Sequence, residues 1–147
     1  MAMTGLESFD ATVQKSNIWL KEIMEKEGWD DRHRAYIALR AVLHAMRDRL
    51  TVDEAVHLGS QLPMLVRGMY YEGWDPSKNP QKIRTKEEFL SRIAREYERA
   101  QPDIDPENAL RAVLKLLSEK ISCGEMEDVK HSFPAEIQEL WPESAVH

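Results

Sequence analysis

The sequence predicts an all-α protein, and three observations predict it. Apolar residues recur at helical spacing along several segments, and the pattern S/T-x-x-E, typical of a helix start, occurs at Thr51, Thr85 and Ser122. No segment shows the alternation of apolar and polar residues that is typical of a strand. We expect a tandem duplication of a roughly 70-residue four-helix unit, packed as one compact helical bundle with pseudo-twofold symmetry.

The duplication is predicted from a repeated spacing. Residues 38–43, ALRAVL, recur unchanged at 109–114, which is 71 positions later. The apolar stripe that follows also recurs at this offset, because Leu39, Leu43, Met46 and Leu50 correspond to Leu110, Leu114, Leu117 and Ile121. Pro63 and Pro134, each suited to the first turn of a helix, correspond in the same way.

Each unit is predicted to contain four helices. In the first unit we expect them at about 9–26, 31–50, 52–59 and 63–71, with Gly28 as a C-terminal cap of the first. In the second unit the first helix begins near Thr85, and the proline-rich segment 101–106 separates it from the next. We expect a first repeat over 1–74, a linker over 75–85 and a second repeat over 86–147.

The composition excludes several classes of protein. The chain has 147 residues and a net charge of −6, with an excess of acid in both halves, which disfavours broad binding to nucleic acid or anionic membranes. Its single cysteine excludes an intramolecular disulfide. No segment has the length and hydropathy of a membrane span, and residues 1–6 lack the pattern of a signal peptide, so we expect a cytoplasmic protein.

The chain resembles the bacterial Domain of Unknown Function 2267 family over roughly residues 8–142. The residues that carry the resemblance are the two ALRAVL segments, the Leu62-Pro63 helix that runs into Met69-Tyr70-Tyr71, and Gly73-Trp74-Asp75-Pro76 followed by Phe89-Leu90. The resemblance implies a two-repeat helical fold found in bacteria. It implies no activity, cofactor or catalytic residue.

Metal and catalytic chemistry find little support in the sequence. His44 and Asp48 are four residues apart and share a helix face, which predicts a surface ion pair more readily than a metal site, because a metal needs three or four ligands. Cys123 begins a predicted helix, but its counterpart Val52 is apolar, so we interpret it as a filler. His57 and His131 are predicted on different helix faces. We expect no metal, no cofactor and no catalytic residue, and the sequence leans against an enzyme without excluding one.

Binding to DNA through a helix-turn-helix is an alternative. Ala55, Gly59 and Leu65 have the spacing that lets two helices cross closely. The helix that would read bases, however, offers only Arg67 and Glu72 as charged residues, whereas base and phosphate contacts need several Arg, Lys, Asn or Gln. Nucleic acid is therefore an unlikely partner on sequence grounds.

The preferred hypothesis is a protein–protein interaction module that also self-associates, as a homodimer. Apolar residues are unusually dense between positions 64 and 74, and the residues expected to contact a partner are Tyr71, Trp74 and Met64. We expect the ring of Trp74 to cover the linker and that of Tyr71 to meet the partner. The rival hypothesis is a small-ligand or enzymatic site between the two repeats, which a buried cleft with polar groups from both units would favour.

Overall fold

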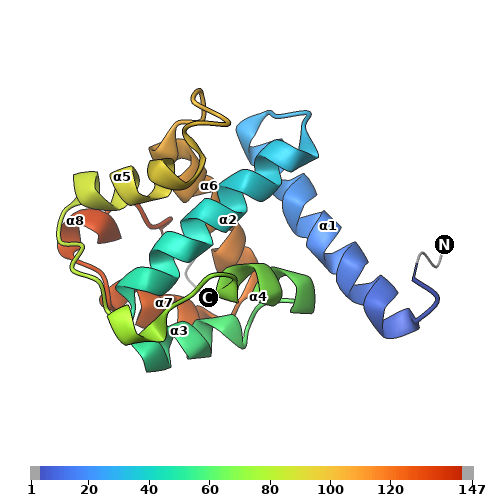
Figure 1. Cartoon of the computed structure of the whole chain (residues 1–147), viewed down its shortest axis with the longest axis horizontal. Helices are drawn as coiled ribbons and strands as arrows, with labels where there is room; N and C mark the ends of the chain where they lie inside the picture. The colour runs from blue at the N-terminus through green and yellow to red at the C-terminus, as the bar shows by residue number, and fades with distance from the viewer. Residues whose placement is uncertain (1–3, 144–147) are drawn as a thin grey trace.

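The computed structural model describes residues 4–143, and this part of the chain is compact and all-helical, with no strand (Figure 1). Its eight α-helices are α1 (Glu7–Glu27), α2 (Arg32–Arg49), α3 (Val52–Gly59), α4 (Met64–Tyr71), α5 (Lys86–Tyr97), α6 (Pro106–Lys120), α7 (Cys123–His131) and α8 (Ala135–Gln138). A short 3-10 helix (Pro76–Lys78) lies between α4 and α5. The helices lie within a few residues of the predicted positions.

Short polar side chains start several of the helices. Thr51 and Glu54 form the complete capping box at α3, in which each side chain bonds the backbone N–H of the other. At α7 only half of the predicted box forms, because the Ser122 hydroxyl accepts from the Glu125 N–H while the Glu125 carboxylate turns to His57 on α3. The missing half of the box is therefore explained by a tertiary contact.

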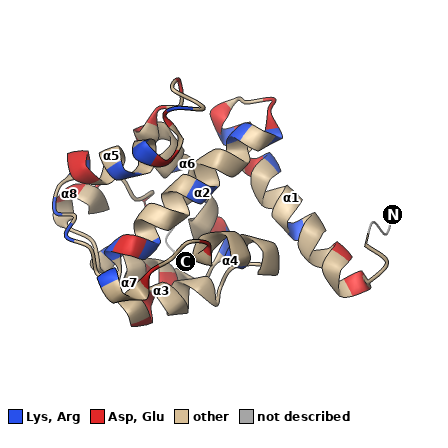
Figure 2. Ribbon diagram, in the orientation of Figure 1, with Lys and Arg blue, Asp and Glu red and all other residues tan. Residues whose placement is uncertain are grey.

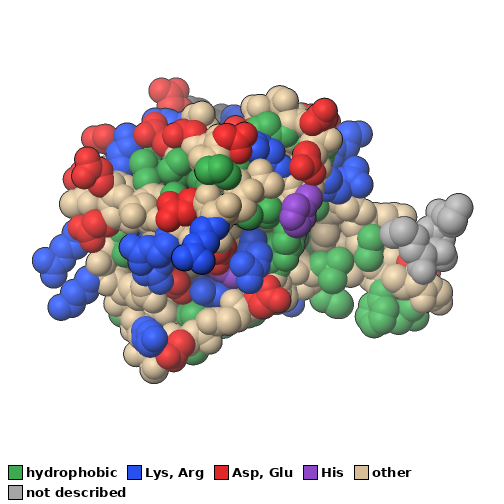
Figure 3. All heavy atoms as spheres, turned by 45° about the horizontal axis from the view of Figure 1, so that its top comes forward, with side chains coloured by type: hydrophobic (Ala, Val, Ile, Leu, Met, Phe, Trp, Pro, Cys, Tyr) green, Lys and Arg blue, Asp and Glu red, His purple; other side chains and the backbone are tan. Residues whose placement is uncertain are grey.

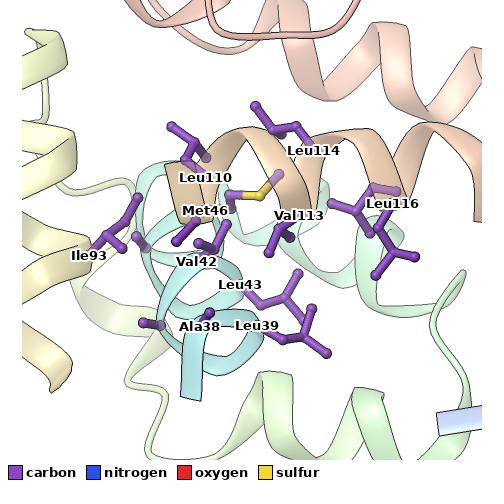
Figure 4. Packing of buried hydrophobic residues seen from close by; sticks show 14 of the residues in the cluster. Ala38, Leu39, Val42, Leu43, Met46, Ile93, Leu110, Val113, Leu114 and Leu116 are labelled. Carbon is purple, nitrogen blue, oxygen red and sulfur yellow. The ribbon is translucent and has the colours of Figure 1, made fainter. Parts of the chain in front are cut away.

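The core is centred on α2, which contacts α1, α3, α4, α5 and α6. Every residue from 41 to 48 is buried, so this stretch of α2 has no solvent-facing side. Leu43 on α2 and Leu114 on α6 are fully buried, as the sequence predicts. Figure 4 shows the α2 side chains packed beneath those of α6, with Met46 near Leu110 and Leu114.

The linker between the two halves is bonded to the C-terminal end of α2. The Asn79 side-chain amide donates to the carbonyl oxygens of Arg47 and Leu50, at 2.6 and 2.8 Å, and accepts a hydrogen bond from the Trp74 indole. The Gln81 N–H donates to the Asp48 carbonyl oxygen at 2.8 Å. These bonds satisfy carbonyl groups that the end of a helix leaves without partners.

The N-terminal half of α1 extends away from the body formed by the other helices (Figure 1). The rest of α1 is anchored by contacts with α2, α4 and α6 and by the buried side chains of Trp19 and Ile23. No helix within residues 4–143 has the length and hydropathy needed to cross a membrane.

Candidate interaction surface

Large apolar side chains are exposed on α1 and α4. Leu6 and Phe9, at the extended end of α1, are each 50% exposed, and Met64 and Leu65, at the start of α4, are 55% and 49% exposed. Figure 3 shows hydrophobic side chains gathered on this extended end. Exposed apolar residues that cluster in this way are typical of a contact site.

A groove separates α1 from α4, and we call it the α1–α4 groove. Its volume is about 480 Å³, and it also reaches Tyr36 and Leu39 of α2. Its lining is mainly apolar and includes Val13, Leu20, Met64, Leu65, Val66 and Met69. Phe9 lies one helical turn before Val13, so the apolar stripe of α1 continues from the groove onto its exposed end.

A second groove lies on the other side of α1 and differs in charge. It has a volume of about 620 Å³, and its charged lining residues are Lys15, Arg67 and Lys120. Arg67 donates to the backbone carbonyl oxygens of Gly59, Ser60 and Leu62. These acceptors are uncharged, so they do not neutralise the positive charge of Arg67. By contrast, the first turn of α1 is acidic, with Glu7 and Asp10.

The three residues predicted to contact a partner do not lie together. Met64 is exposed and borders both grooves. Tyr71 and Trp74 are half-buried, and their rings stack on each other with a centroid separation of 5.6 Å. The Tyr71 hydroxyl lies over Gly59 and donates weakly to the Val56 carbonyl oxygen, while the Trp74 indole is bonded to Asn79 of the linker. Both aromatic rings thus serve the packing of α3, α4 and the linker.

The charged side chains of α4 and its end are engaged within the chain. Arg67 is turned back onto the end of α3, and Glu72, which follows α4, pairs with Arg40 of α2 at 3.0 Å. In the view of Figure 2, acidic and basic residues are mixed along the helices rather than sorted onto separate faces. These positions give α4 little with which to read bases.

The prediction of a surface ion pair between His44 and Asp48 is wrong, because both side chains are buried and each bonds elsewhere. The His44 ring bridges two elements, with Nδ1 2.5 Å from the Glu96 carboxylate on α5 and Nε2 2.7 Å from the Met69 carbonyl oxygen on α4. Both ring nitrogens of this buried histidine therefore have hydrogen-bond partners, as a buried polar group requires.

Asp48 is shared by two arginines from different halves of the chain. Its carboxylate accepts from the Arg47 Nε and from an Arg92 guanidinium nitrogen on α5, each at 2.9 Å. Arg47 also donates to the backbone carbonyl oxygens of Tyr70 and Glu72. The α2–α5 contact is therefore a buried ionic network.

A second polar contact joins α3 to α7. His57 Nδ1 lies 2.5 Å from the Glu125 carboxylate, and the Ser132 hydroxyl donates to Glu54. His57 and His131, predicted on different faces, border one hollow of about 580 Å³ together with Asp53 and Asp128. Among residues 4–143, no three His, Cys, Asp or Glu side chains are arranged to hold a metal ion. Cys123 is a free, exposed thiol.

Fold and surface together define a compact helical protein with an exposed apolar face and buried ionic contacts between its halves. Residues 16–140 match the model of a family described as an uncharacterized conserved protein, DUF2267. The chain belongs to this family, as its resemblance indicates. No curated protein matches the chain.

Proposed function

We propose that this protein is a non-enzymatic interaction module that self-associates as a homodimer through α1 and the α1–α4 groove. The observation that carries the proposal is the pairing of an exposed apolar helix end with an apolar groove on the same chain. A surface that offers both parts is self-complementary, and two copies related by a twofold axis use it twice.

The distribution of charge along α1 favours an antiparallel pairing of the two copies. The first turn of α1 contains Glu7 and Asp10, and Lys15 and Lys21 follow. An antiparallel arrangement centred near Val13 brings acidic turns towards basic residues, whereas a parallel arrangement sets like charges side by side. In the same arrangement Phe9 and Leu6 lie over the groove of the second copy.

The apolar residues involved are sufficient for a reversible dimer. Burying a large apolar side chain stabilises by about 1.5–3 kcal/mol, so covering one that is half exposed contributes roughly 1 kcal/mol. Leu6, Phe9, Met64 and Leu65 each count twice in a twofold dimer. Of the three residues predicted to contact a partner, Met64 would do so directly. Tyr71 and Trp74 would act indirectly, because their packing holds α4 in place.

Sedimentation velocity of three proteins tests this function. The wild type should sediment as a dimer in a concentration-dependent way. Phe9→Glu should be monomeric and should keep the helical content of the wild type by circular dichroism, because Phe9 is exposed on an extended helix end. Val56→Glu is the matched control, since Val56 is similarly exposed but lies on α3, outside the groove.

Two outcomes would contradict the proposal. One is a wild-type protein that is monomeric at every concentration up to its solubility limit. The other is a Phe9→Glu variant that dimerises as the wild type does. Loss of association in both variants would also count against the groove, because it would show a general effect of added negative charge rather than a loss of this contact.

We further propose that the chain arose by tandem duplication and is a cytoplasmic bacterial protein with two repeats, 1–74 and 86–147, joined by residues 75–85. The order of helices supports the duplication, since a long helix is followed by two shorter ones in each half. An unpaired cysteine is typical of a reducing compartment. In a crystal structure, residues 38–70 should superpose on 109–141, and a different handedness of the two halves would refute the duplication.

A further inference from the structure

A small cleft lies where α2 crosses α5, and it is independent of the α1–α4 groove. We call it the α2–α5 cleft. Its volume is about 220 Å³, and its lining residues are Ala41, His44, Ala45, Arg47 and Asp48 of α2 with Arg92, Arg95 and Glu96 of α5. Each half of the chain thus supplies polar groups to one hollow, the condition that favours a small-ligand site.

The cleft carries more positive than negative charge. Three arginines, Arg47, Arg92 and Arg95, line the cleft together with two carboxylates, those of Asp48 and Glu96. Figure 3 shows Lys and Arg side chains gathered on the front of the molecule, although the chain as a whole has a net charge of −6. A local excess of cations on an acidic protein attracts an anion.

The two carboxylates of the cleft are already engaged. Asp48 bonds Arg47 and Arg92, and Glu96 bonds His44 and lies 3.5 Å from Arg40. Arg95 is exposed, lines the cleft and has no carboxylate within ion-pair distance among the residues that the structure describes. Its guanidinium therefore remains for a ligand.

Arg92 and Arg95 are placed to act together. They are three residues apart on α5, so their side chains lie on one face of the helix. One guanidinium nitrogen of Arg92 donates to Asp48, which fixes the side chain and leaves its other N–H groups free to donate. Two guanidinium groups side by side match the oxygens of a phosphate, which arginine binds in a bidentate way.

The adjoining hollow on α5 adds further charges of both signs. It is lined by Lys82, Glu87 and Glu88 in addition to Arg92 and Arg95. Glu88 accepts a hydrogen bond from the Thr85 hydroxyl at the start of α5, and Lys82 adds a cation near the same two arginines. These charges flank the α2–α5 cleft, whose lining also includes the small side chains of Ala41 and Ala45.

We propose that the α2–α5 cleft binds a phosphate group, with Arg92 and Arg95 as its principal ligands. The cleft has room for one tetrahedral oxyanion and a small attached group. Either inorganic phosphate or a small phosphate monoester could supply this group, and the experiment below distinguishes the two.

Calorimetric titration with inorganic phosphate, at an ionic strength held constant with sodium chloride, tests the proposal. The wild type should bind phosphate, and Arg95→Gln should bind it about tenfold or more weakly because it loses charged hydrogen bonds. The matched control is Arg32→Gln, which removes an equal charge from an exposed arginine at the far end of α2 and should bind as the wild type does. Titration with glycerol phosphate then shows whether an ester or free phosphate binds more tightly.

The proposal is overturned if the wild type binds no phosphate, if Arg95→Gln binds it unchanged, or if Arg32→Gln loses as much affinity as Arg95→Gln. Should Arg95→Gln fail to fold by circular dichroism, Arg92→Lys answers the same question. This change keeps a cation opposite Asp48 but removes the planar fork. Weaker binding by Arg92→Lys supports the site, and unchanged affinity refutes it.

Discussion

Nδ1 of His44 lies 2.5 Å from Oε1 of Glu96, and this contact joins the first half of the chain to the second across 52 positions of sequence. Burial raises the pKa of Glu96, but the hydrogen bond from His44 and the charges of His44, Arg40 and Arg47 lower it, so that its pKa falls below the ordinary value for glutamate. Folding therefore favours the ionised carboxylate.

This shift predicts a loss of stability in acid. A carboxyl group whose pKa is lower in the folded state contributes stability above its unfolded pKa and loses it as the pH falls through the folded pKa. We expect Glu96→Gln to be less stable than the wild type at neutral pH, and the difference to shrink below the ordinary pKa of 4.5. Urea unfolding from neutral to acidic pH measures the difference.

The matched control for this experiment is Glu25→Gln, which changes an exposed glutamate on α1. Its free energy of unfolding should follow that of the wild type across the pH range. A gap between Glu96→Gln and the wild type that stays constant with pH would show that the carboxylate of Glu96 has the same pKa in the folded and unfolded chains.

Truncation of either central leucine should be costly. Leu43→Ala and Leu114→Ala each remove a fully buried side chain and should lower the free energy of unfolding by about 2–5 kcal/mol. Val56→Ala, at a position that is half exposed and lies outside the α1–α4 groove, is the comparison and should change it far less. A loss below about 0.5 kcal/mol at Leu43 or Leu114 would contradict their placement in the core.

The close approach of Tyr71 to Gly59 predicts a coupling between these residues. A Cβ atom at position 59 would overlap the Tyr71 hydroxyl and lie 2.7 Å from its Cζ, so Gly59→Ala should destabilise the protein, by about 1–3 kcal/mol. In a Tyr71→Ala background the same change should cost much less, because the Tyr71 ring is gone and only Tyr70 Cε2, at 3.1 Å, remains close. Equal costs in the two backgrounds, in a double-mutant cycle of urea unfolding, would show that the two residues do not interact.

Asn79→Ala should uncap α2. It removes two hydrogen bonds to the carbonyl oxygens of Arg47 and Leu50, and each such bond contributes about 0.5–1.5 kcal/mol, so we expect a loss of roughly 1–3 kcal/mol. Asn108→Ala, on an exposed face of α6, provides the comparison and should be nearly neutral. Thermal unfolding followed by circular dichroism measures both, and equal unfolding temperatures for the two variants would contradict the capping role.

The helices are predictable from the sequence because their causes are local. Apolar spacing, Thr51 with Glu54, and the glycine at position 28 act within a few residues of the helix ends that they define. The same reasoning wrongly predicts a complete capping box at Ser122, because the Glu125 carboxylate bonds His57 on α3 and not the Ser122 N–H.

The buried charges are not predictable by the same route. A histidine and an aspartate four residues apart on a helix are typical of an exposed face, and the residues that bury them, Arg92 and Glu96, come from a helix far along the chain. Tyr71 illustrates the same limit. The density of apolar residues around it predicts a contact with a partner, whereas its packing against Gly59 depends on how α3 and α4 cross.

The bonds between the linker and α2 affect how the chain unfolds. A fragment that ends before Asp75 would keep α2 but lack Asn79, Gln81 and every residue of α5 and α6 that covers it. Such a fragment should expose the apolar side of α2 and behave as a molten globule rather than as a small native domain. Amide hydrogens of α2 and α6 should accordingly exchange slowly and with one common free energy of opening, as expected when both helices open in a single cooperative event.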